Sequence, residues 1–362
     1  MKILIVKLSS LGDVVHAMPA VQDILRAMPD AQIDWVVERG FAPLVQRCQG
    51  VSRVIASDLR RWRKAPFSPE THRAWRAFKL ELQQEAYDAV IDLQGLTKSA
   101  LVAWLARLSP GGKRYGLANQ TEGSSFEAPA RWVAHQAIPM PAHSHAVTRS
   151  RLLCAQALHY DLPVELSFGL VAHPEQARSG IKALTNGAGL RGTVALVHGT
   201  SRADKQWPLA HWRDLAQRLN DAGFGVVLPH GSPVEQHAAQ EIAQGLAHAL
   251  VWPVLSLDAL TDALATCCGV IGVDSGLSHM AVALDLPHVQ IYNFDTAWRT
   301  GPLAESTQDF CRADFSPPRS TEVDPVNIQK LPRQCSVFVQ PTPSVNAVWQ
   351  AWLGALSSSA NA

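Results

Sequence analysis

The sequence predicts an α/β protein made of two doubly wound, Rossmann-like halves. Short apolar runs alternate with segments of helical periodicity along most of the chain, which is the pattern of parallel βαβ units. The alternation pauses once, between 161 and 192, where prolines and glycines accumulate as in a domain connection. The chain has 362 residues, 47% of them hydrophobic, which is enough for two cores. We therefore expect domains at 1–168 and 169–342, followed by a C-terminal helix at 343–357.

The first half is expected to contain three short buried strands, each followed by helical periodicity. The expected strands are 3–8, 33–37 and 89–93, and the expected helices are 21–27, 73–85, 100–107 and 146–158. The second half repeats this order. Its expected strands are 194–198, 225–228, 269–273 and 289–292, and its expected helices are 209–220, 234–246, 257–266 and 278–284. After a proline-rich, poorly periodic tail at 312–343, the segment 345–356 carries Val348, Trp349, Trp352 and Leu356 on one helical face.

Composition excludes several classes of protein. The net charge of +1 gives no global indication of nucleic-acid binding, so an anionic partner requires a local basic patch. No apolar stretch approaches the roughly 20 residues of a membrane span, and no signal cleavage site follows the first apolar run, so we expect neither a membrane-spanning nor a secreted protein. The six cysteines form no C-x-x-C pair, which argues against a disulfide framework and a zinc site and favours the cytoplasm. We interpret His143 and His145 as surface or core histidines rather than metal ligands.

Asp13 follows the first predicted strand, in the turn Ser-Ser-Leu-Gly-Asp at 9–13. In open α/β sheets, ligands bind at the carboxyl ends of the strands, so this carboxylate is placed for chemistry. A simple helix cap is the alternative interpretation, and the turn alone does not decide between the two.

Two further strand ends in the second half carry groups that suit phosphate. Thr200, Ser201 and Lys205 lie in the loop after one strand, and Ser275 and Gly276 begin a helix after another, where unpaired N–H groups attract anions. Neither loop is a P-loop, and no G-x-G-x-x-G follows a strand. Ordinary capped βα turns are the alternative.

Ser275 excludes one enzyme class, and Glu235, at a further strand end, has two possible roles. Ser275 cannot be a hydrolase nucleophile elbow, because Val273 and Leu277 stand where that motif needs glycine. Glu235 begins a helix at another strand end, where it is suited either to accept ribose hydroxyls or simply to complement the helix dipole.

A basic cluster, Arg-Arg-Trp-Arg-Lys at 60–64, supplies the local cationic patch that the near-neutral chain otherwise lacks. Arginine pairs bidentately with carboxylates and phosphates, and the neighbouring indole and further cations favour a binding patch. A solvated loop is the alternative interpretation.

Several ordered motifs between residues 1 and about 292 resemble the lipopolysaccharide heptosyltransferases of ADP-heptose glycosyltransferase family 9, of the heptosyltransferase I type. The motifs are Lys-Leu-Ser-Ser-Leu-Gly-Asp-Val-Val-His at 7–16, Asp-Trp-Val-Val-Glu-Arg-Gly-Phe-Ala at 34–42, Arg-Arg-Trp-Arg-Lys-Ala at 60–65, Tyr-Asp-Ala-Val-Ile-Asp-Leu-Gln-Gly-Leu-Thr-Lys-Ser-Ala at 87–100 and Val-Asp-Ser-Gly-Leu-Ser-His at 273–279. The resemblance implies a GT-B fold, in which two Rossmann-like domains face a central cleft. It also implies inverting transfer of heptose from ADP-L-glycero-β-D-manno-heptose to the first Kdo of Kdo₂-lipid A, without a cofactor or catalytic metal.

The same resemblance assigns roles to individual residues. Asp13 is the general base. The implied donor-binding residues are Thr200, Ser201 and Lys205 at the diphosphate, Glu235 at the ribose, Leu255 in place of a methionine over the adenine, and Asp274, Ser275, Gly276 and His279 at the phosphate and heptose. The implied acceptor-binding residues are Ser10, Arg60, Arg61, Arg63, Lys64 and Lys98. The implied location is the cytoplasmic face of the inner membrane, as a peripheral protein.

The resemblance has one clear departure and leaves two alternatives. Relatives usually continue Gly-Pro-Thr-Asp-Pro after the fourth strand of the second half, whereas this chain has Asn-Phe-Asp-Thr-Ala-Trp-Arg-Thr-Gly-Pro at 293–302, so contacts from that loop cannot be transferred. A later ADP-heptose transferase of the core would share the donor half but not the basic cluster at 60–64. A nucleotide-binding module without catalysis would use Asp13 only as a cap.

Overall fold

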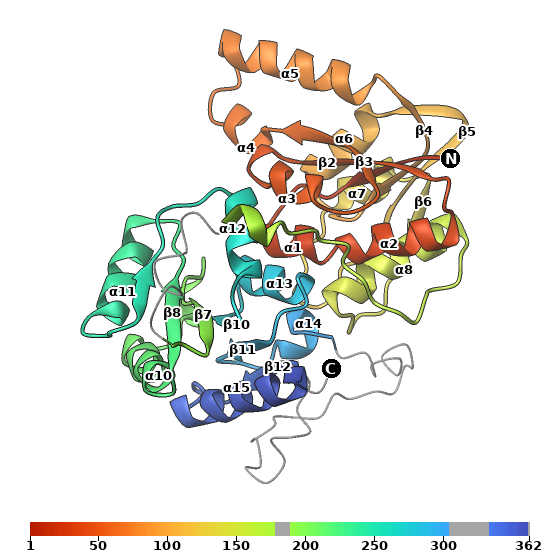
Figure 1. Ribbon diagram of the computed structural model, residues 1–362. Helices are drawn as coiled ribbons and strands as arrows, with labels where there is room; N and C mark the ends of the chain where they lie inside the picture. Colours follow the sequence, from red (N-terminus) through yellow and green to blue (C-terminus); the bar gives the residue numbers. More distant parts are fainter. Residues whose placement is uncertain (178–188, 304–332, 361–362) are drawn as a thin grey trace. The chain divides into compact units, whose positions relative to one another are not determined.

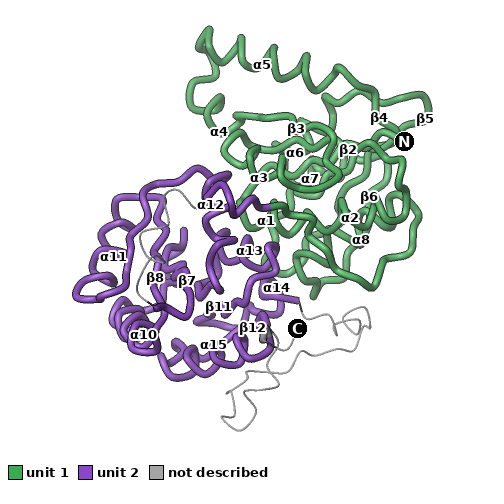
Figure 2. The backbone as a smooth tube through the Cα atoms, viewed as in Figure 1, with its two compact units in different colours: residues 1–171 green, residues 172–362 purple. Residues whose placement is uncertain are grey.

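The chain folds into two compact units, Met1–Val171 and Ala172–Ala362, drawn green and purple in Figure 2. The structure is a computed structural model that describes residues 1–177, 189–303 and 333–360, without the side chains of the last two. Residues 169–171 stay with the first unit because they pair with the segment before β3: Gly169 and Leu170 lie against Gln49 and Cys48. The chain thus divides after Val171, where 168 was expected.

The first unit is built on a parallel six-stranded sheet of order β3-β2-β1-β4-β5-β6. Its strands are β1 (Lys2–Val6), β2 (Gln32–Glu38), β3 (Val51–Ser57), β4 (Ala86–Asp92), β5 (Arg107–Leu117) and β6 (Gln136–Ile138). The sequence order of the strands reverses direction between β1 and β4, which are neighbours paired through Val6 and Asp92. The loops after these two strands therefore meet at the position where open α/β sheets bind their ligands.

Right-handed crossovers place the helices of this unit on the two faces of its sheet. One face carries α1 (Leu11–Val15), α2 (Met18–Ala27), η1 (Arg39–Phe41), α3 (Ala42–Gln46) and α8 (Ala146–Leu158), and the other carries α4 (Leu59–Trp62), α5 (Pro69–Leu82), α6 (Thr97–Leu105) and α7 (Ala128–Val133). A single hydrophobic cluster joins α4, α5, α6 and α7 to strands β1–β4. Figure 1 shows α2 and α8 on one side of this sheet and α5 on the other.

The second unit repeats this topology with the order β12-β11-β10-β7-β8-β9. Its strands are β7 (Gly192–Val197), β8 (Phe224–Leu228), β9 (Ala249–Val251), β10 (Gly269–Val273), β11 (His288–Tyr292) and β12 (Gln334–Phe338). Its helices are η2 (Ala203–Lys205), α10 (Leu209–Asp221), α11 (Pro233–Ala243), α12 (Leu257–Ala265), α13 (Gly276–Ala283), α14 (Ala297–Thr300) and α15 (Val345–Ala360). Here the order reverses between β7 and β10, so the loops after these strands are the equivalent position.

The final helix, α15, belongs to the core of the second unit and is not a separate appendage. Trp352 and Val348 are fully buried in the same cluster as Trp212. The Trp352 ring also fills the space beside Gly269, where a Cβ would lie 2.5 Å from the indole. Losing so large a buried ring typically costs 3–5 kcal/mol, so α15 is part of what stabilises the unit.

The structure confirms the α/β class and every expected strand, but the sequence missed five strands. β3, β6 and β9 are short or partly exposed edge strands, so their apolar pattern is weak. β5 contains Pro110, Gly111 and Gly112 and begins at Arg107, where the expected helix was wrongly extended. β12 lies in the tail that was expected to be irregular, so that expectation was wrong at Gln334–Phe338, while 312–332 lies outside the described residues.

Candidate active site

The first candidate site is the loop after β1, where Asp13 occupies the third position of α1. Ser10 begins the helix, and both its backbone N–H and its hydroxyl donate to Asp13 Oδ2, at 2.9 and 2.8 Å. The Asp13 carboxylate therefore stabilises the helix start from within the first turn, and Ser10, not Asp13, is the cap residue. The side chain of Asp13 keeps 41% of its surface exposed, so it can still accept a proton from a ligand.

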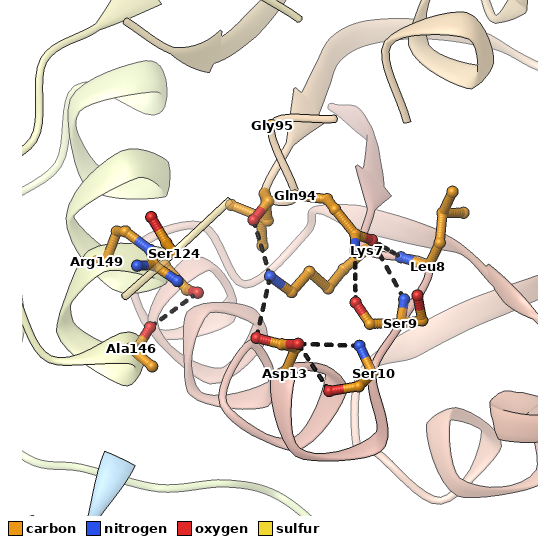
Figure 3. Close-up of polar contacts among 12 residues, drawn as sticks. Lys7, Leu8, Ser9, Ser10, Asp13, Gln94, Gly95, Ser124, Ala146 and Arg149 are labelled. Atoms are coloured by element: carbon orange, nitrogen blue, oxygen red, sulfur yellow. Dashed lines mark hydrogen bonds and ion pairs between the residues drawn. The ribbon is translucent and has the colours of Figure 1, made fainter. Parts of the chain in front are cut away.

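Lys7, which sequence reasoning missed, lies buried beneath this carboxylate (Figure 3). Its Nζ donates to the Leu93 carbonyl at the end of β4, 3.0 Å away, and lies 3.9 Å from Asp13 Oδ1. The ammonium thus joins the two strand ends at the reversal point of the sheet. Its burial could have been foreseen only from the pairing of β1 with β4, because the local sequence shows an ordinary lysine in an apolar run.

These charges set the protonation state of Asp13. Burial alone would raise the pKa of the carboxyl, but the Lys7 ammonium, the two hydrogen bonds from Ser10 and the Arg149 guanidinium outweigh it and lower the pKa below its usual value. Burial lowers the pKa of Lys7, and the Asp13 charge opposes that change. The loop therefore presents an ionised, partly exposed carboxylate at neutral pH.

Gln94 fixes the course of the loop that carries Ser10. Its amide oxygen accepts from the N–H groups of Leu8 and Ser9, at 2.7 and 3.2 Å, and its amide nitrogen donates to the Ser9 carbonyl at 2.5 Å. Lys98 adds a hydrogen bond from its Nζ to the Ser9 hydroxyl at 2.8 Å. Lys98, expected to meet the acceptor, is thus placed beside the base loop, and Gln94 is a residue the sequence reading did not single out.

The second candidate site is centred on Asp274, at the end of β10. Its carboxylate is 4% exposed and is surrounded by donors. Lys205 Nζ lies 2.5 Å from Oδ2, while His279 Nε2 and the Thr300 hydroxyl lie 3.3 and 3.4 Å from Oδ1. Burial would raise the pKa of Asp274, but the hydrogen bonds and charges of His279 and Lys205 hold it well below its usual range. Lys205, expected at the diphosphate, is therefore oriented by the Asp274 carboxylate.

The start of α13 lies beside this cluster. Ser275 is the cap residue, with extended backbone, and Gly276 is the first of the eight helical residues. The buried hydroxyl oxygen of Ser275 has no hydrogen-bond partner among the described residues. The sequence correctly placed a helix start at Ser275 and Gly276, and a hydroxyl and N–H groups at such a position suit an anion.

The remaining donor-side residues lie around the ends of β7 and β8. Thr200 donates weakly to the Asp274 carbonyl at 3.5 Å, and Ser201 is exposed. Glu235 sits in the first turn of α11, accepts from the Gly231 N–H at 2.7 Å and keeps its carboxylate in contact with Gly199, where any Cβ would clash. Leu255 is partly exposed before α12. Both interpretations of Glu235 thus fit its position.

The divergent loop after β11 contacts the Lys205 cluster from the other side. The Asn293 amide donates to the carbonyls of Asp204 and Gln206, at 3.0 and 2.8 Å, and so holds the two ends of the turn that carries Lys205. Thr300, from the same loop, contacts Asp274. The loop whose contacts could not be transferred from relatives therefore supports the donor-side cluster directly.

The basic cluster splits into exposed cations and one core residue. Arg60, Arg61, Arg63 and Lys64 are exposed on and after α4. Trp62 is buried against Trp75 and Phe78, with ring centroids 5.6 and 5.5 Å away. The indole beside the cations is therefore not part of the surface: Trp62 anchors α4 in the hydrophobic cluster, and the cations alone are exposed.

The two histidines of the H-x-H pair have ordinary structural roles, as expected. His145 is buried and accepts from the Val147 N–H at the start of α8, and His143 lies 3.0 Å from Glu122 at the surface. Within 1–177, 189–303 and 333–360, no group of three or more His, Cys, Asp or Glu residues is arranged to hold a metal ion. In the same ranges, no helix is both long and apolar enough to cross a membrane.

Comparisons with known proteins place this arrangement in a family. The sequence model of "Glycosyltransferase family 9 (heptosyltransferase)" matches residues 75–326. The chain is 41% identical over 316 residues to lipopolysaccharide heptosyltransferase 1 of Escherichia coli K12, covering 86% of this chain and 94% of that one. Identity to lipopolysaccharide heptosyltransferase 2 of the same strain is 27% over 327 residues, covering 85% and 87%.

Solved structures agree. E. coli heptosyltransferase WaaC with ADP matches with a TM-score of 0.77 at 33% identity, covering 97% of this chain and 98% of that one. The same enzyme with ADP-2-deoxy-2-fluoro heptose matches with a TM-score of 0.70, covering 100% of both chains. The two Rossmann-like units therefore form a GT-B fold.

Proposed function

The chain belongs to glycosyltransferase family 9, the heptosyltransferase family, and from this premise we propose that it moves L-glycero-D-manno-heptose from ADP-heptose to the first Kdo of Kdo₂-lipid A in lipopolysaccharide inner-core synthesis. The observation that carries the proposal is the ionised, partly exposed Asp13 at the reversal point of the first sheet. Identity of 41% to heptosyltransferase 1, against 27% to heptosyltransferase 2, supports the choice of acceptor.

Donor binding is assigned to the second unit. Lys205 and the free hydroxyl of Ser275 at the start of α13 are suited to meet the diphosphate, because both are donors at one strand-end position. Asp274 is an unsuitable direct partner for phosphate, since both are anions. We assign it the role of holding Lys205 and His279 in place. The solved relatives that bind ADP and ADP-2-deoxy-2-fluoro heptose support this donor class.

The transfer step follows from these positions. The acceptor hydroxyl attacks C1 of the heptose, the C1–O bond to the diphosphate breaks on the opposite face, and ADP leaves, which inverts the anomeric configuration. Asp13 takes the proton of the hydroxyl, a general-base contribution of typically 10²–10⁴-fold. Lys205 meets the charge that develops on the leaving diphosphate, the electrostatic effect that usually supplies the largest part of catalysis.

Acceptor binding is assigned to the exposed cations at 60–64, with Ser10 and Lys98 beside the base. Kdo carries a carboxylate and lipid A carries phosphates, and both anions suit arginine forks. Because this acceptor is anchored in a bilayer, we place the protein at the cytoplasmic face of the inner membrane as a peripheral protein.

A transfer assay tests the proposal. Purified protein, ADP-heptose and Kdo₂-lipid A should yield ADP and a lipid heavier by one heptose, with the new linkage inverted by NMR. Parallel reactions use the same lipid already carrying one heptose. Transfer only to the longer acceptor would reassign the chain to a later core step, and ADP binding without any transfer would make it a nucleotide-binding module.

A further inference from the structure

The outer surface of helices α4, α5, α6 and α7 combines exposed aromatic and aliphatic side chains with an excess of cations. We call the segments 58–82, 97–107 and 127–135 the outer layer. Five large hydrophobic side chains are exposed there: Phe67, Leu80, Leu101, Trp104 and Trp132. The two tryptophans are 60% and 78% exposed. Soluble proteins rarely gather such residues on one surface unless that surface binds something.

The outer layer also carries many more exposed cations than exposed carboxylates. Nine arginines and lysines are exposed there: Arg60, Arg61, Arg63, Lys64, Arg73, Arg76, Lys79, Arg107 and Arg131. The exposed carboxylates of the outer layer are Glu70 and Glu127, and Glu70 already pairs with Arg73 at 3.1 Å. The whole chain carries a net charge of only +1, so its positive charge is concentrated on this surface.

The opposite face of the same sheet provides an internal comparison. Helices α1, α2, η1, α3 and α8 carry no exposed large hydrophobic side chain, and their two exposed cations, Arg26 and Arg39, pair with Glu165 at 3.0 Å and with Asp58 at 3.1 Å. Every residue of this unit is described, so the comparison covers all helices on both faces. The combination of exposed tryptophan and cation is therefore a property of one face and not of the unit as a whole.

We propose that the outer layer is the surface through which the protein docks on an anionic phospholipid bilayer. Tryptophan favours the headgroup region of membranes, where its ring is partly buried and its N–H stays hydrated. Exposed lysines and arginines are attracted to anionic headgroups and lie within a Debye length of them when the tryptophans insert. The inner faces of helices α4, α5, α6 and α7 pack on the sheet, so their outer faces can lie in the plane of the membrane interface.

The inference deepens the proposed function, because it names the surface that brings the enzyme to a membrane-anchored acceptor. The cations at 60–64 are assigned to the acceptor itself. The docking contribution is therefore tested on α5, α6 and α7, at Arg73, Arg76, Lys79, Trp104 and Trp132, none of which contacts the Asp13 or Lys205 clusters.

Vesicle co-sedimentation without donor or acceptor tests the proposal. Wild-type protein should bind vesicles of phosphatidylglycerol and phosphatidylethanolamine, and should not bind vesicles of phosphatidylcholine. Added salt should weaken the binding. Arg73→Gln/Arg76→Gln/Lys79→Gln should weaken partition at least about tenfold, given the attraction expected per cation. Arg26→Gln/Arg213→Gln/Arg218→Gln, which removes the same charge elsewhere, should change it little.

The apolar half of the surface is tested in the same way. Trp104→Ser/Trp132→Ser should weaken partition at least about tenfold, whereas Val234→Ser/Val254→Ser, which removes exposed apolar groups from the second unit, should not. Circular dichroism and transfer to a water-soluble, delipidated Kdo acceptor should match wild type, so that a loss of docking is distinguished from a failure of the proposed function.

Three results would overturn the docking assignment. The first is a wild-type protein that does not bind anionic vesicles, and the second is binding of both outer-layer variants at the wild-type level. Sedimentation velocity that shows a wild-type dimer dissociated by the tryptophan substitutions would assign the surface to a second copy of this chain instead.

Discussion

Asp13 and Asp274 occupy equivalent places in the two units but differ in exposure and in the number of donors around them. Each follows a strand at the point where the strand order of its sheet reverses. Asp13 accepts two hydrogen bonds from Ser10 and keeps 41% of its side chain exposed, whereas Asp274 is 4% exposed and lies against Lys205, His279 and Thr300. The pKa of each carboxyl is lowered, but only Asp13 has an open side from which a proton can arrive.

The difference teaches that a strand-end carboxylate can act on a substrate or act on other side chains, depending on how many donors surround it. We propose that Asp13 takes part in the reaction directly. The Asp274 carboxylate contacts Lys205 and His279, and we propose that it is a positioning residue. Substitutions at the two sites should therefore separate catalysis from donor affinity.

The largest expected effect is at Asp13. Asp13→Asn keeps an oxygen that can accept from Ser10 but removes the base, so kcat should fall at least about 10²-fold with the fold unchanged. Steady-state transfer rates measure the change, and Asp30→Asn, an exposed aspartate after α2, is the matched control. Near-normal kcat in Asp13→Asn would reduce this residue to its role at the start of α1.

A smaller effect is expected at Lys205. Lys205→Met removes a charged donor, so ADP affinity by calorimetry should fall roughly 10- to 100-fold, and transfer should slow as well. Arg202→Met, in the same loop and paired with Asp204, should bind ADP nearly as wild type does.

The same site allows a sharper test of the Asp274 assignment. Lys205→Met leaves the buried Asp274 carboxylate with one cation fewer, which should also lower the melting temperature. Adding Asp274→Asn should restore much of that stability without restoring ADP affinity. Recovery of affinity in the double variant would show that Asp274, not Lys205, governs donor binding.

Neutralising the basic cluster should affect the acceptor only. Each exposed cation contributes about 0.2–1 kcal/mol, so the combined change of Arg60, Arg61, Arg63 and Lys64 to glutamine should raise the acceptor KM far more than any single change. Added salt should mimic the substitution, and ADP affinity should stay constant. If KM and its salt dependence were unaltered, the cations would be an ordinary solvated surface.

The smallest effect is expected in the pH dependence of kcat. Lys7 lowers the pKa of Asp13, so Lys7→Met should raise that pKa, and the carboxylate should then be lost at a higher pH as the solution is acidified. The acid limb of kcat should move to higher pH, while Lys7→Arg, which keeps the charge, should leave the limb in place. A uniform loss of kcat at every pH would indicate only a disturbed fold.

The local hydrophobic pattern was sufficient to predict the strands whose residues are buried in continuous runs. The central strands β1, β4, β7 and β10 are mostly apolar and buried, and their strand ends predicted the positions of Asp13 and Asp274. The strands that were missed are less buried: β3 lies at the edge of its sheet, and β5, between β4 and β6, is buried only at its last three residues. Those strands are specified by their neighbours more than by their own sequence.

Pairings between distant residues could not be predicted. Lys7 meets the Leu93 carbonyl because β1 lies beside β4, and Lys205 meets Asp274 because β7 lies beside β10. Neither contact has a local signature. Trp62 is a residue whose local sequence is misleading. A tryptophan between cations suggests a binding residue, but Trp62 packs on Trp75 and Phe78 in the core.

The separation of catalysis from donor affinity is tested most directly by measuring both in one protein. Asp13→Asn should bind ADP with wild-type affinity in calorimetry, and in single-turnover reactions with saturating ADP-heptose it should transfer heptose at least about 10²-fold more slowly than wild type. Weakened ADP binding together with a wild-type single-turnover rate would place Asp13 in donor binding and contradict the account.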